Sequence, residues 1–466
     1  MRHRPSPRLA IVTLWALLAL VGGVAVDVHA AVIDTVRTGE VTFTGTTQDV
    51  TLSPALADLT KSILFFNVRH NSNSPQQGLV RGSMIDASTL RFAKTSAGTS
   101  VTVRWYAVEF SAGVSVQRGT TAQAATVTNA AISPVTLSGT FVLISRQQSS
   151  NNYSNDEFLR TQLTSASNLE MALNSGSGGT NDWQVVSMPG AVVQRGTLTL
   201  ASGSTSTTQA ISAVDTTRSF VLYSYNAPNG TQSNIGQKMV QAWLSSPTQV
   251  TFQRNNTGVA LSIAWEVVQL PAGDHVQEQL HSFASGAGQQ DAAINTIDAT
   301  RAVSFSGSQA IGGLSWGRTA YAADDNPGIA SFTFGFVDNS TLRMQRSGSA
   351  ATADVTSFVV EFAAPNAAPT LSAIGPQSVN EGATLNLPVS ATDPEATTPI
   401  LTAENLPLNA SFTDNANGIG ALVFNPDYTQ AGVYNVTFIA SDGALADSEV
   451  VAITVNNVNQ APVLAA

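Results

Sequence analysis

The segment at residues 261–270 reads Leu-Ser-Ile-Ala-Trp-Glu-Val-Val-Gln-Leu, and its side chains at 261, 263, 265 and 267 are apolar. This period of two places them on one face of an extended chain, which is typical of a β-strand. Similar segments surround Trp105 and Trp183, and a fourth copy has Ser357 where the others have tryptophan. No long pattern of helical period appears in these copies. The sequence therefore predicts an all-β chain.

A second motif sets the repeat length. Val-Gln-Arg-Gly-Thr at 116–120 recurs at 193–197, decays to Val-Gln-Glu-Gln at 276–279, and has a looser copy, Val-Arg-Thr-Gly, at 36–39. Self-similarity at a period of about 80 residues indicates tandem modules, and short strands in a module of this size favour a β-sandwich. We predict an elongated series of four such sandwiches. Their boundaries are 31–115, 116–192, 193–275 and 276–364.

The repeated tryptophan and the repeated Arg-Gly step each allow two interpretations. An exposed indole offers a surface on which a sugar ring can stack, but a tryptophan inside an alternating strand more often packs in a sandwich core, and we favour the core. The arginine could contact an acidic partner. We instead expect a link between modules, with the glycine at a positive φ and an exposed polar residue beside it.

The segment 365–458 has a different character. It contains Asn-Ala-Ala-Pro at 366–369, Val-Asn-Glu-Gly at 379–382, Ala-Thr-Asp-Pro-Glu at 391–395, Ser-Asp-Gly at 441–443 and Val-Ala-Ile-Thr-Val at 451–455. In order and spacing these motifs resemble the putative-Ig and dystroglycan-type cadherin-like repeats, including tandem-95-type repeats, of bacterial surface proteins. The resemblance implies a seven-stranded Greek-key sandwich, usually deployed in tandem. Asn-Gln-Ala-Pro at 459–462 would then begin a further repeat at 459–466, so we expect a longer array.

The same resemblance implies calcium ligands at domain junctions. The positions that match are four carboxylates: Glu381, Asp393, Glu395 and Asp442. Ca²⁺ prefers six to eight oxygen ligands, and the junction at 456–462 carries neutral amides where true cadherins have acidic residues. The alternative is that Asp393 and Asp442 simply form turns. Calcium is the one cofactor that the sequence suggests.

Composition excludes several classes of function, and the N-terminal segment indicates where the protein is located. Charged residues make up 11% of the 466, the net charge is −10, and there is no cysteine. Nucleic-acid binding needs a positive field, and thiol chemistry and disulfides need cysteine. Residues 1–30 carry three Arg, an apolar stretch and a Val-His-Ala cleavage site, which predicts a cleaved secretory signal. Removing its three Arg and one Asp leaves 18 basic and 30 acidic residues, a net charge of −12, with no membrane span expected in the mature chain.

Candidate catalytic groups are few. Gly-Leu-Ser-Trp-Gly at 313–317 matches the nucleophile elbow of serine hydrolases, but that fold needs a strand–turn–helix context and a later histidine. The histidines of the mature chain precede Ser315, so a glycine-rich hairpin is expected there. A glycosidase needs two carboxylates across a cleft, and the available groups are Glu109, Glu361 and the pair Asp324-Asp325. Nothing in the repeat predicts a cleft between them, and we do not expect an enzyme.

We therefore expect an exported, modular bacterial protein of the cell surface or extracellular matrix, acting in adhesion or as a structural spacer and stabilised by calcium. Its partners would be surface or matrix components, including glycans, because repeated weak sites on one scaffold raise avidity. One alternative is a carbohydrate-binding array in which loop residues Tyr153, Trp243 or Trp316 face glycans. Another is a non-catalytic accessory part of a longer secreted hydrolase.

Overall fold

The computed structural model describes residues 31–153, 157–176, 178–228 and 234–460. The predicted signal peptide lies outside these residues, as do positions 461–466 of the predicted further repeat. Within the described residues the chain is β structure joined by loops and single helical turns. The predicted all-β class is therefore confirmed.

Each repeat consists of two three-stranded antiparallel sheets. In the large sheet the first, sixth and third strands lie in that order, and in the small sheet the second, fifth and fourth. Repeat 1 contains β1 (Val32–Phe43), β2 (Thr47–Thr51), β3 (Ser62–His70), β4 (Arg81–Asp86), β5 (Thr89–Ala93) and β6 (Val101–Ala112). Repeat 2 contains β7 (Ser115–Ala122), β8 (Val127–Ala131), β9 (Thr140–Gln147), β10 (Arg160–Ser165), β11 (Asn168–Ala172) and β12 (Thr180–Ser187).

Repeats 3 and 4 follow the same plan. Repeat 3 contains β13 (Val192–Leu200), β14 (Ser206–Ala210), β15 (Ser219–Asn226), β16 (Gln241–Ser246), β17 (Gln249–Gln253) and β18 (Leu261–Gln269). Repeat 4 contains β19 (His275–Phe283), β20 (Gln289–Ala293), β21 (Ala302–Phe305), β22 (Arg318–Thr319), β23 (Phe332–Asp338), β24 (Thr341–Arg346) and β25 (Ala353–Glu361), with β22 as an added short strand paired to β25. The ladders between these strands all stay within one repeat.

Short helical turns occupy the connections. Four 3-10 turns directly precede the third strand of a repeat: η1 (Leu59–Lys61), η2 (Leu137–Gly139), η3 (Thr216–Arg218) and η5 (Ala299–Arg301). In three of them an aspartate caps the turn, as when the Asp58 carboxylate accepts the Thr60 N–H at 2.8 Å. Such caps satisfy backbone donors that the turn leaves free. The remaining turns lie in long loops: α1 (Pro75–Gly78), η4 (Ile235–Gln237) and η6 (Pro327–Ala330).

The third strand of each repeat is buried on both faces, and this determines how the repeats assemble. Along β3, Leu64 and Phe66 belong to a cluster confined to repeat 1, whereas Ile63 and Phe65 belong to a second cluster. That second cluster draws buried residues from all four repeats. A strand that is apolar on both sides cannot be covered by one partner sheet. The four repeats therefore share a core.

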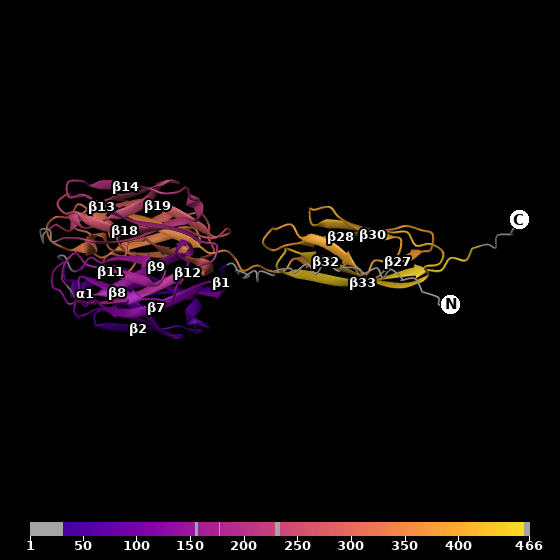
Figure 1. Cartoon of the computed structure of the whole chain (residues 1–466), viewed down its shortest axis with the longest axis horizontal. Coiled ribbons are helices and arrows are strands. Elements are labelled where there is room, and N and C mark those ends of the chain that lie inside the picture. Colours follow the sequence, from indigo (N-terminus) through magenta and orange to yellow (C-terminus); the bar gives the residue numbers. More distant parts are fainter. Residues whose placement is uncertain (1–30, 154–156, 177, 229–233, 461–466) are drawn as a thin grey trace, which may run out of the picture.

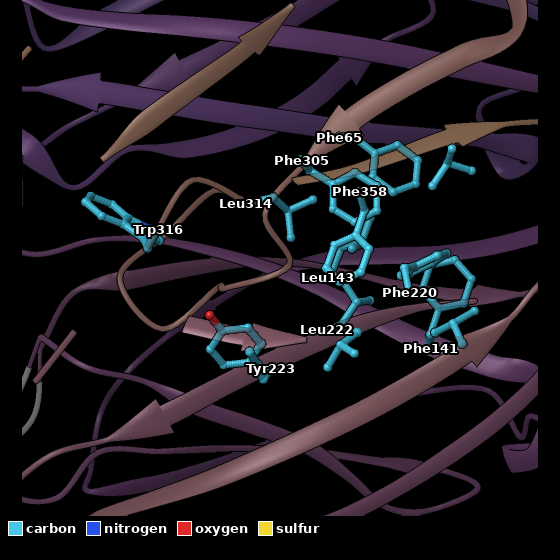
Figure 2. Packing of buried hydrophobic residues seen from close by; sticks show 14 of the residues in the cluster. Phe65, Phe141, Leu143, Phe220, Leu222, Tyr223, Phe305, Leu314, Trp316 and Phe358 are labelled. Atoms are coloured by element: carbon cyan, nitrogen blue, oxygen red, sulfur yellow. The ribbon is translucent and has the colours of Figure 1, made fainter. Parts of the chain in front are cut away.

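Aromatic side chains from several repeats meet in this shared core. Phe65 of repeat 1 stacks on Phe305 of repeat 4 with ring centroids 5.4 Å apart, and Phe220 of repeat 3 meets Phe305 edge-on at 5.3 Å. Phe141 of repeat 2 lies edge-on to Phe220 at 6.1 Å, and Phe358 adds a fifth ring (Figure 2). Offset and edge-on pairs of this kind are favourable beyond the apolar area that they bury.

Contacts between repeats close a ring. The Gln184 side chain of repeat 2 bonds both the N–H and the C=O of Leu64 in repeat 1. Glu266 of repeat 3 accepts the Val142 N–H of repeat 2 at 2.9 Å, and Glu278 of repeat 4 accepts the Leu244 N–H of repeat 3 at 2.9 Å. Finally, repeat 4 returns to repeat 1, where the Tyr106 hydroxyl donates to the Phe334 carbonyl at 2.8 Å.

A buried segment of repeat 4, residues 306–317, runs through the middle of this ring, and we call it the central loop. Leu314 N–H donates to the Phe66 carbonyl of repeat 1, and the Gln309 backbone N–H donates to the Tyr223 carbonyl of repeat 3. The Gln309 side chain bonds the backbone of β9 in repeat 2. Gly307 takes φ +86°, and a Cβ there would lie 2.0 Å from the Val221 carbonyl oxygen, so no other residue fits.

The expected elongated series is thus corrected. Residues 31–364 form one body, which we call the head, and the C-terminal domain stands beside it (Figure 1). The reason is that a single repeat has too little surface to cover both faces of its third strand, so the neighbouring repeats cover it.

The C-terminal domain, residues 365–460, is a sandwich of two four-stranded sheets around its own core. One sheet has the order β26-β28-β31-β30 and the other β27-β33-β32-β29, with β27 and β33 parallel. The strands are β26 (Thr370–Leu371), β27 (Gln377–Asn380), β28 (Leu385–Thr392), β29 (Ile400–Glu404), β30 (Ala410–Asp414), β31 (Ile419–Phe424), β32 (Gly432–Ser441) and β33 (Ala446–Asn456). Because β26 and β27 are two parts of one first strand, this is the seven-stranded arrangement that the resemblance implies.

None of the helices in the described part of the chain has the length and apolar character needed to cross a membrane.

Candidate functional site

Within the described residues, three junctions between repeats each hold a cleft in an equivalent position. One wall comes from the fourth strand of a repeat, and the other from the first and sixth strands of the next repeat in the ring. We name them by the repeats that they join. Cleft 1–2 has a volume of about 230 Å³, cleft 2–3 about 180 Å³ and cleft 4–1 about 190 Å³. These volumes suit one small ring rather than a drug-sized ligand.

In cleft 1–2 the polar side chains largely satisfy one another. The Asp182 carboxylate accepts from Arg81 at 2.8 Å, from the Ser83 hydroxyl at 2.7 Å and from the Thr120 hydroxyl at 2.6 Å. Trp183 lines the same cleft and donates its indole N–H to Thr121 at 3.0 Å. A carboxylate with several donors is held in one position, so this polar group ties repeat 1 to repeat 2.

Cleft 2–3 has the same frame with different polar residues. Arg195 and Glu266 form an ion pair at 3.2 Å on its wall, and burial raises the pKa of Glu266 above its ordinary value. Ala264 occupies the position of Asp182 and Leu198 that of Thr121. The central loop reaches this cleft through Gln309. Cleft 2–3 therefore lacks the hydrogen-bond network that Asp182 forms on the wall of cleft 1–2.

Cleft 4–1 closes the series. The fourth strand of repeat 4, β23, supplies Thr333 and Gly335, and repeat 1 supplies Glu40 and Arg104. Beside it, Arg69 of repeat 1 pairs with Glu40 at 3.2 Å and also bonds Gln345 and Thr333 of repeat 4. The same strand positions thus form a cleft where the last repeat meets the first.

The repeated tryptophans pack in the sandwich cores, as we favoured. Trp105 and Trp183 lie in the separate cores of repeats 1 and 2, and Trp265 in the shared cluster. Each lies opposite a motif glycine on the neighbouring strand: Gly39, Gly119 or Gly196. Trp183 and Trp265 also line clefts 1–2 and 2–3, respectively.

The expected positive φ at the motif glycine is wrong. Gly119 and Gly196 lie within β7 and β13, outside the set of residues with positive φ. Their role is space: a Cβ at Gly119 would lie 2.4 Å from Trp183 Cζ2. Repeat 4 has Gln279 opposite Ser357, so both members of the pair change together. The sequence already showed this paired change, from Gly and Trp in the first three repeats to Gln279 and Ser357 in repeat 4, and such a change indicates that the two positions are in contact.

The motif arginine is half-buried rather than an exposed linker residue. Arg118 donates at 2.6 Å to the Leu59 and Ser62 carbonyls of repeat 1, around the end of η1. Arg195 makes the equivalent bonds to the Leu137 and Thr140 carbonyls of repeat 2. The arginine thus binds the preceding repeat and contributes to the ring.

The sequence motif around Ser315 belongs to the central loop and not to a surface hairpin. Ser315 is buried, and its Oγ accepts the Val68 N–H of repeat 1. Trp316 is buried and donates to the Gly312 carbonyl at 2.7 Å. Tyr153 is also buried, while Trp243 is partly exposed on β16. The expectation that Tyr153 and Trp316 face glycans is therefore wrong.

The candidate acid groups in the head have structural partners. Glu109 pairs with Arg37 at 3.0 Å and accepts the Asp58 N–H at 2.9 Å. Glu361, at the equivalent position of repeat 4, accepts the Asp298 N–H at 2.9 Å and pairs with Arg301. Both carboxylates hold the turn before the third strand of their own repeat.

A buried polar cluster, which sequence patterns did not indicate, gathers around Lys238 of repeat 3. Its ammonium donates to the Tyr153 carbonyl of repeat 2 at 2.6 Å and lies 3.5 Å from Asp325 of repeat 4. Burial lowers the pKa of Lys238 and raises that of Asp325 to about 6, although each opposes the other's shift. Nearby, burial lowers the pKa of His70 of repeat 1 to about 3. The long loops that follow the third strands supply Tyr153, Lys238 and Asp325, and His70 is the last residue of β3.

The four carboxylates proposed for calcium fall at two ends of the C-terminal domain. Asp442 accepts from Asn366 at 2.8 Å, and Glu395 accepts the Ala367 N–H at 3.1 Å, at the end that joins the head. Asp393 lies there too and accepts the Glu395 N–H. Glu381 accepts the Val458 N–H at 2.9 Å, beside the far end of β33. At about 3.3 Å per residue along β33, Glu381 cannot share an ion with the other three.

No group of three or more potential metal-ligating side chains occurs in the described parts of the chain. The carboxylates at the head-side end bond mainly to backbone N–H groups, while Asp393 Oδ2 is buried without a hydrogen-bond partner. These residues fit a turn-stabilising role without metal. Calcium binding stays a prediction.

Comparison with known proteins identifies the C-terminal domain. Residues 366–455 match the model of the bacterial Ig domain. Similar solved structures include a titin M10 complex with an obscurin-like 1 Ig domain, at 21% identity over 20% of this chain and 97% of that one, with a TM-score of 0.17. Titin domains Z1Z2 in complex with telethonin match at 16% identity, over 28% and 73% of the chains, with a TM-score of 0.19. No curated protein matches. Residues 366–455 thus form a bacterial Ig domain, and the chain has the character of a modular extracellular or structural protein.

Proposed function

We propose that this chain is an exported adhesion protein in which the head binds glycans of a cell surface or matrix and the Ig domain acts as a spacer. The observation that carries the proposal is the recurrence of one cleft at three junctions of the ring. Several weak sites on one rigid body raise the effective concentration of each for a multivalent surface. The acidic mature chain, with 18 basic and 30 acidic residues, favours neutral glycans over anionic ones.

The clefts offer binding sites that do not depend on the carboxylates of the head, which are engaged in structural contacts. Each cleft is built on strands of two repeats, and rigid elements hold binding groups more firmly than loops do. The shared core fixes the clefts relative to one another. A multivalent partner would therefore meet sites at constant separations, which favours avidity when the spacing matches.

The test is attachment of the full mature chain to immobilised bacterial matrix polysaccharides and cell surfaces. We expect the chain to be retained on these surfaces. Retention should fall when clefts are blocked so that the chain becomes monovalent, and free oligosaccharide should compete with the surface for binding. A separately expressed C-terminal domain, residues 365–460, should show no such retention. If that domain alone accounts for all binding, or if the full chain binds no surface, the head is a spacer and the proposal is wrong.

Calcium remains a second, narrower proposal, limited to the head-side end of the Ig domain. There Asp393, Glu395 and Asp442 lie around residues 366–367, and the buried oxygen of Asp393 has no partner. If an ion binds, these residues would supply carboxylate oxygens and the ion would stiffen the link to the head. Its test is the stability measurement described in the Discussion.

A further inference from the structure

Cleft 2–3 differs from cleft 1–2 in leaving its indole N–H without a partner. In repeat 3 Trp265 is only 6% exposed, and its buried indole N–H has no hydrogen-bond partner. The Thr161 hydroxyl, on the opposite wall, is likewise buried and unpartnered, with the side chain 8% exposed. Buried polar groups are nearly always bonded to protein or to ordered water. Two such groups in one cleft therefore need an occupant.

The equivalent position in repeat 2 shows how the indole N–H is satisfied when a partner is available. There the equivalent indole, Trp183, donates to the Thr121 hydroxyl. In repeat 3 the residue at the position of Thr121 is Leu198, which has no acceptor. Asp182 on the wall of cleft 1–2 accepts hydrogen bonds from three side chains, whereas Ala264 at the equivalent position of cleft 2–3 offers no polar group.

The indole nitrogen lies close to Gly196, another residue that lines the cleft. A Cβ at Gly196 would be 3.3 Å from Trp265 Nε1, and both residues line cleft 2–3. Because the nitrogen itself is buried, an occupant bonds to it only when the indole shifts toward the cleft.

The chemistry of the walls selects the occupant. Trp265 offers a donor only, and the Thr161 hydroxyl can donate or accept. The charged groups on the walls are the Arg195–Glu266 pair, which sum to zero, so the cleft favours neither an anion nor a cation. An indole edge beside aliphatic carbons suits a ligand with both C–H and O–H groups. A volume of about 180 Å³ accommodates about six waters or one small ring.

We propose that cleft 2–3 binds one neutral, hydroxylated ring, a single sugar residue, with one ring hydroxyl accepting the Trp265 N–H and another bonding to Thr161. This rests on the proposed function of the head and names the cleft and the atoms that recognise the glycan. In cleft 1–2 the Trp183 indole N–H is already bonded to Thr121, so a glycan in that cleft would not be recognised through the indole N–H.

The experiment follows the indole N–H signals of the full mature chain by ¹H–¹⁵N NMR, with Trp265→Phe to assign the signal. Glucose, galactose, mannose and N-acetylglucosamine are titrated separately, each also as its methyl glycoside. We expect one of them to shift the Trp265 signal and leave that of Trp183 in place, with a Kd on the order of millimolar. Binding of the methyl glycoside indicates the end of a glycan chain, and binding of the free sugar alone indicates a monosaccharide ligand.

The decisive variant is Leu198→Thr, which gives Trp265 the internal partner that Trp183 has. We expect about tenfold weaker sugar binding, because a hydrogen bond to the ligand is replaced by one within the protein. Thr161→Val, of nearly equal shape, is a second variant with an expected several-fold loss, and serves if Leu198→Thr does not fold. Thr121→Leu in repeat 2 is the matched control: it removes the partner of the Trp183 indole N–H and should leave the Kd read from the Trp265 signal unchanged.

The proposal is overturned if saturating sugar leaves the Trp265 signal unmoved, since the two groups then hold ordered water only. It is also overturned if both Leu198→Thr and Thr161→Val bind sugar as the parent chain does. In either case attachment of the chain to polysaccharide surfaces is measured separately, and its persistence shows that the head binds through a different cleft. Loss of that attachment instead removes the proposed function itself.

Discussion

Replacing Gly119 with Ala tests whether the motif glycine is there to make room for tryptophan. The added Cβ would lie 2.4 Å from Trp183 Cζ2, whereas ordinary contacts begin near 3.4 Å, so the indole must move by about 1 Å. That ring packs in the core of repeat 2. Overpacking of this kind costs about 1–3 kcal/mol, and the loss of glycine flexibility in the unfolded chain returns about 0.4–1 kcal/mol. We expect a net destabilisation of about 1–2 kcal/mol.

The assay is denaturant unfolding followed by tryptophan fluorescence, which reports on the head alone because residues 365–466 contain no tryptophan. The control is Gly203→Ala: a methyl group added to that glycine would have no neighbour within 4 Å, and its φ is not positive, so the change should be neutral or slightly stabilising. Equal unfolding free energies for the two alanine variants would refute the steric reasoning.

A double-mutant cycle extends the test to the exchange seen in repeat 4. Gly119→Gln and Trp183→Ser recreate the Gln279–Ser357 pair within repeat 2. Trp183→Ser alone should cost about 3–5 kcal/mol through the cavity that it leaves. Because the new glutamine can enter that space, the two changes together should cost about 0.5–3 kcal/mol less than their sum. Strict additivity would mean that the two positions do not compensate each other.

Four further outcomes follow from the contacts between and within domains. Gln184→Ala should destabilise the head by about 2 kcal/mol, since it leaves a backbone N–H and C=O of β3 unpaired; Gln194→Ala, which removes a similar pair of bonds at an exposed site, should cost less. Burial raises the pKa of Glu278 to about 8. Between about pH 4.5 and 8 the folded head therefore keeps a proton that the unfolded chain has lost, so the stability of the head should fall as pH rises through this range. In Glu278→Gln this fall in stability should be measurably smaller. Identical pH profiles for the two proteins would contradict the prediction. Lys238→Met should cost about 3–5 kcal/mol by leaving Asp325 buried without its cation, and Asp325→Asn in the same chain should recover part of it. Excess Ca²⁺ against chelator should raise the thermal midpoint of the separately expressed Ig domain, read by the fluorescence of Tyr428 and Tyr434; coincident midpoints would remove calcium from the proposal.

The strands of the head could be predicted because period-two patterns and self-similarity are local properties of a sequence. The closed ring could not, because it depends on which surfaces meet between residues as far apart in the chain as Arg69 and Gln345, which are separated by 276 positions. A signal was nevertheless present. The third strands read Ser-Ile-Leu-Phe-Phe at 62–66, Thr-Phe-Val-Leu-Ile at 140–144 and Ser-Phe-Val-Leu-Tyr at 219–223, without alternation. Continuous apolar runs are typical of strands that are buried on both faces.

The candidate site was less predictable than the fold. The clefts have walls from two repeats, so neither repeat carries the whole pattern. The Ser315 motif matched a catalytic signature because both uses require glycines around a tightly packed serine, but here its hydroxyl accepts a backbone N–H of the neighbouring repeat. Trp265 could be placed in a core by periodicity, whereas the missing partner of its N–H became visible only beside Trp183 and Thr121.

Ring closure also protects the edges of the sheets, and this links the fold to a role outside the cell. An unpaired strand edge is a template for aggregation. The third strand is an edge strand of each large sheet, and side chains from other repeats bond its free backbone groups: Gln184 on β3, and Glu266 with Gln309 on β9. A repeat on its own would expose this edge together with one apolar face of the same strand. The four repeats must therefore fold as one cooperative unit, and a chain cut between repeats should associate or aggregate rather than yield small stable sandwiches. The proposed adhesive function would need such a body, since modules joined by flexible links would lose the fixed spacing of the clefts.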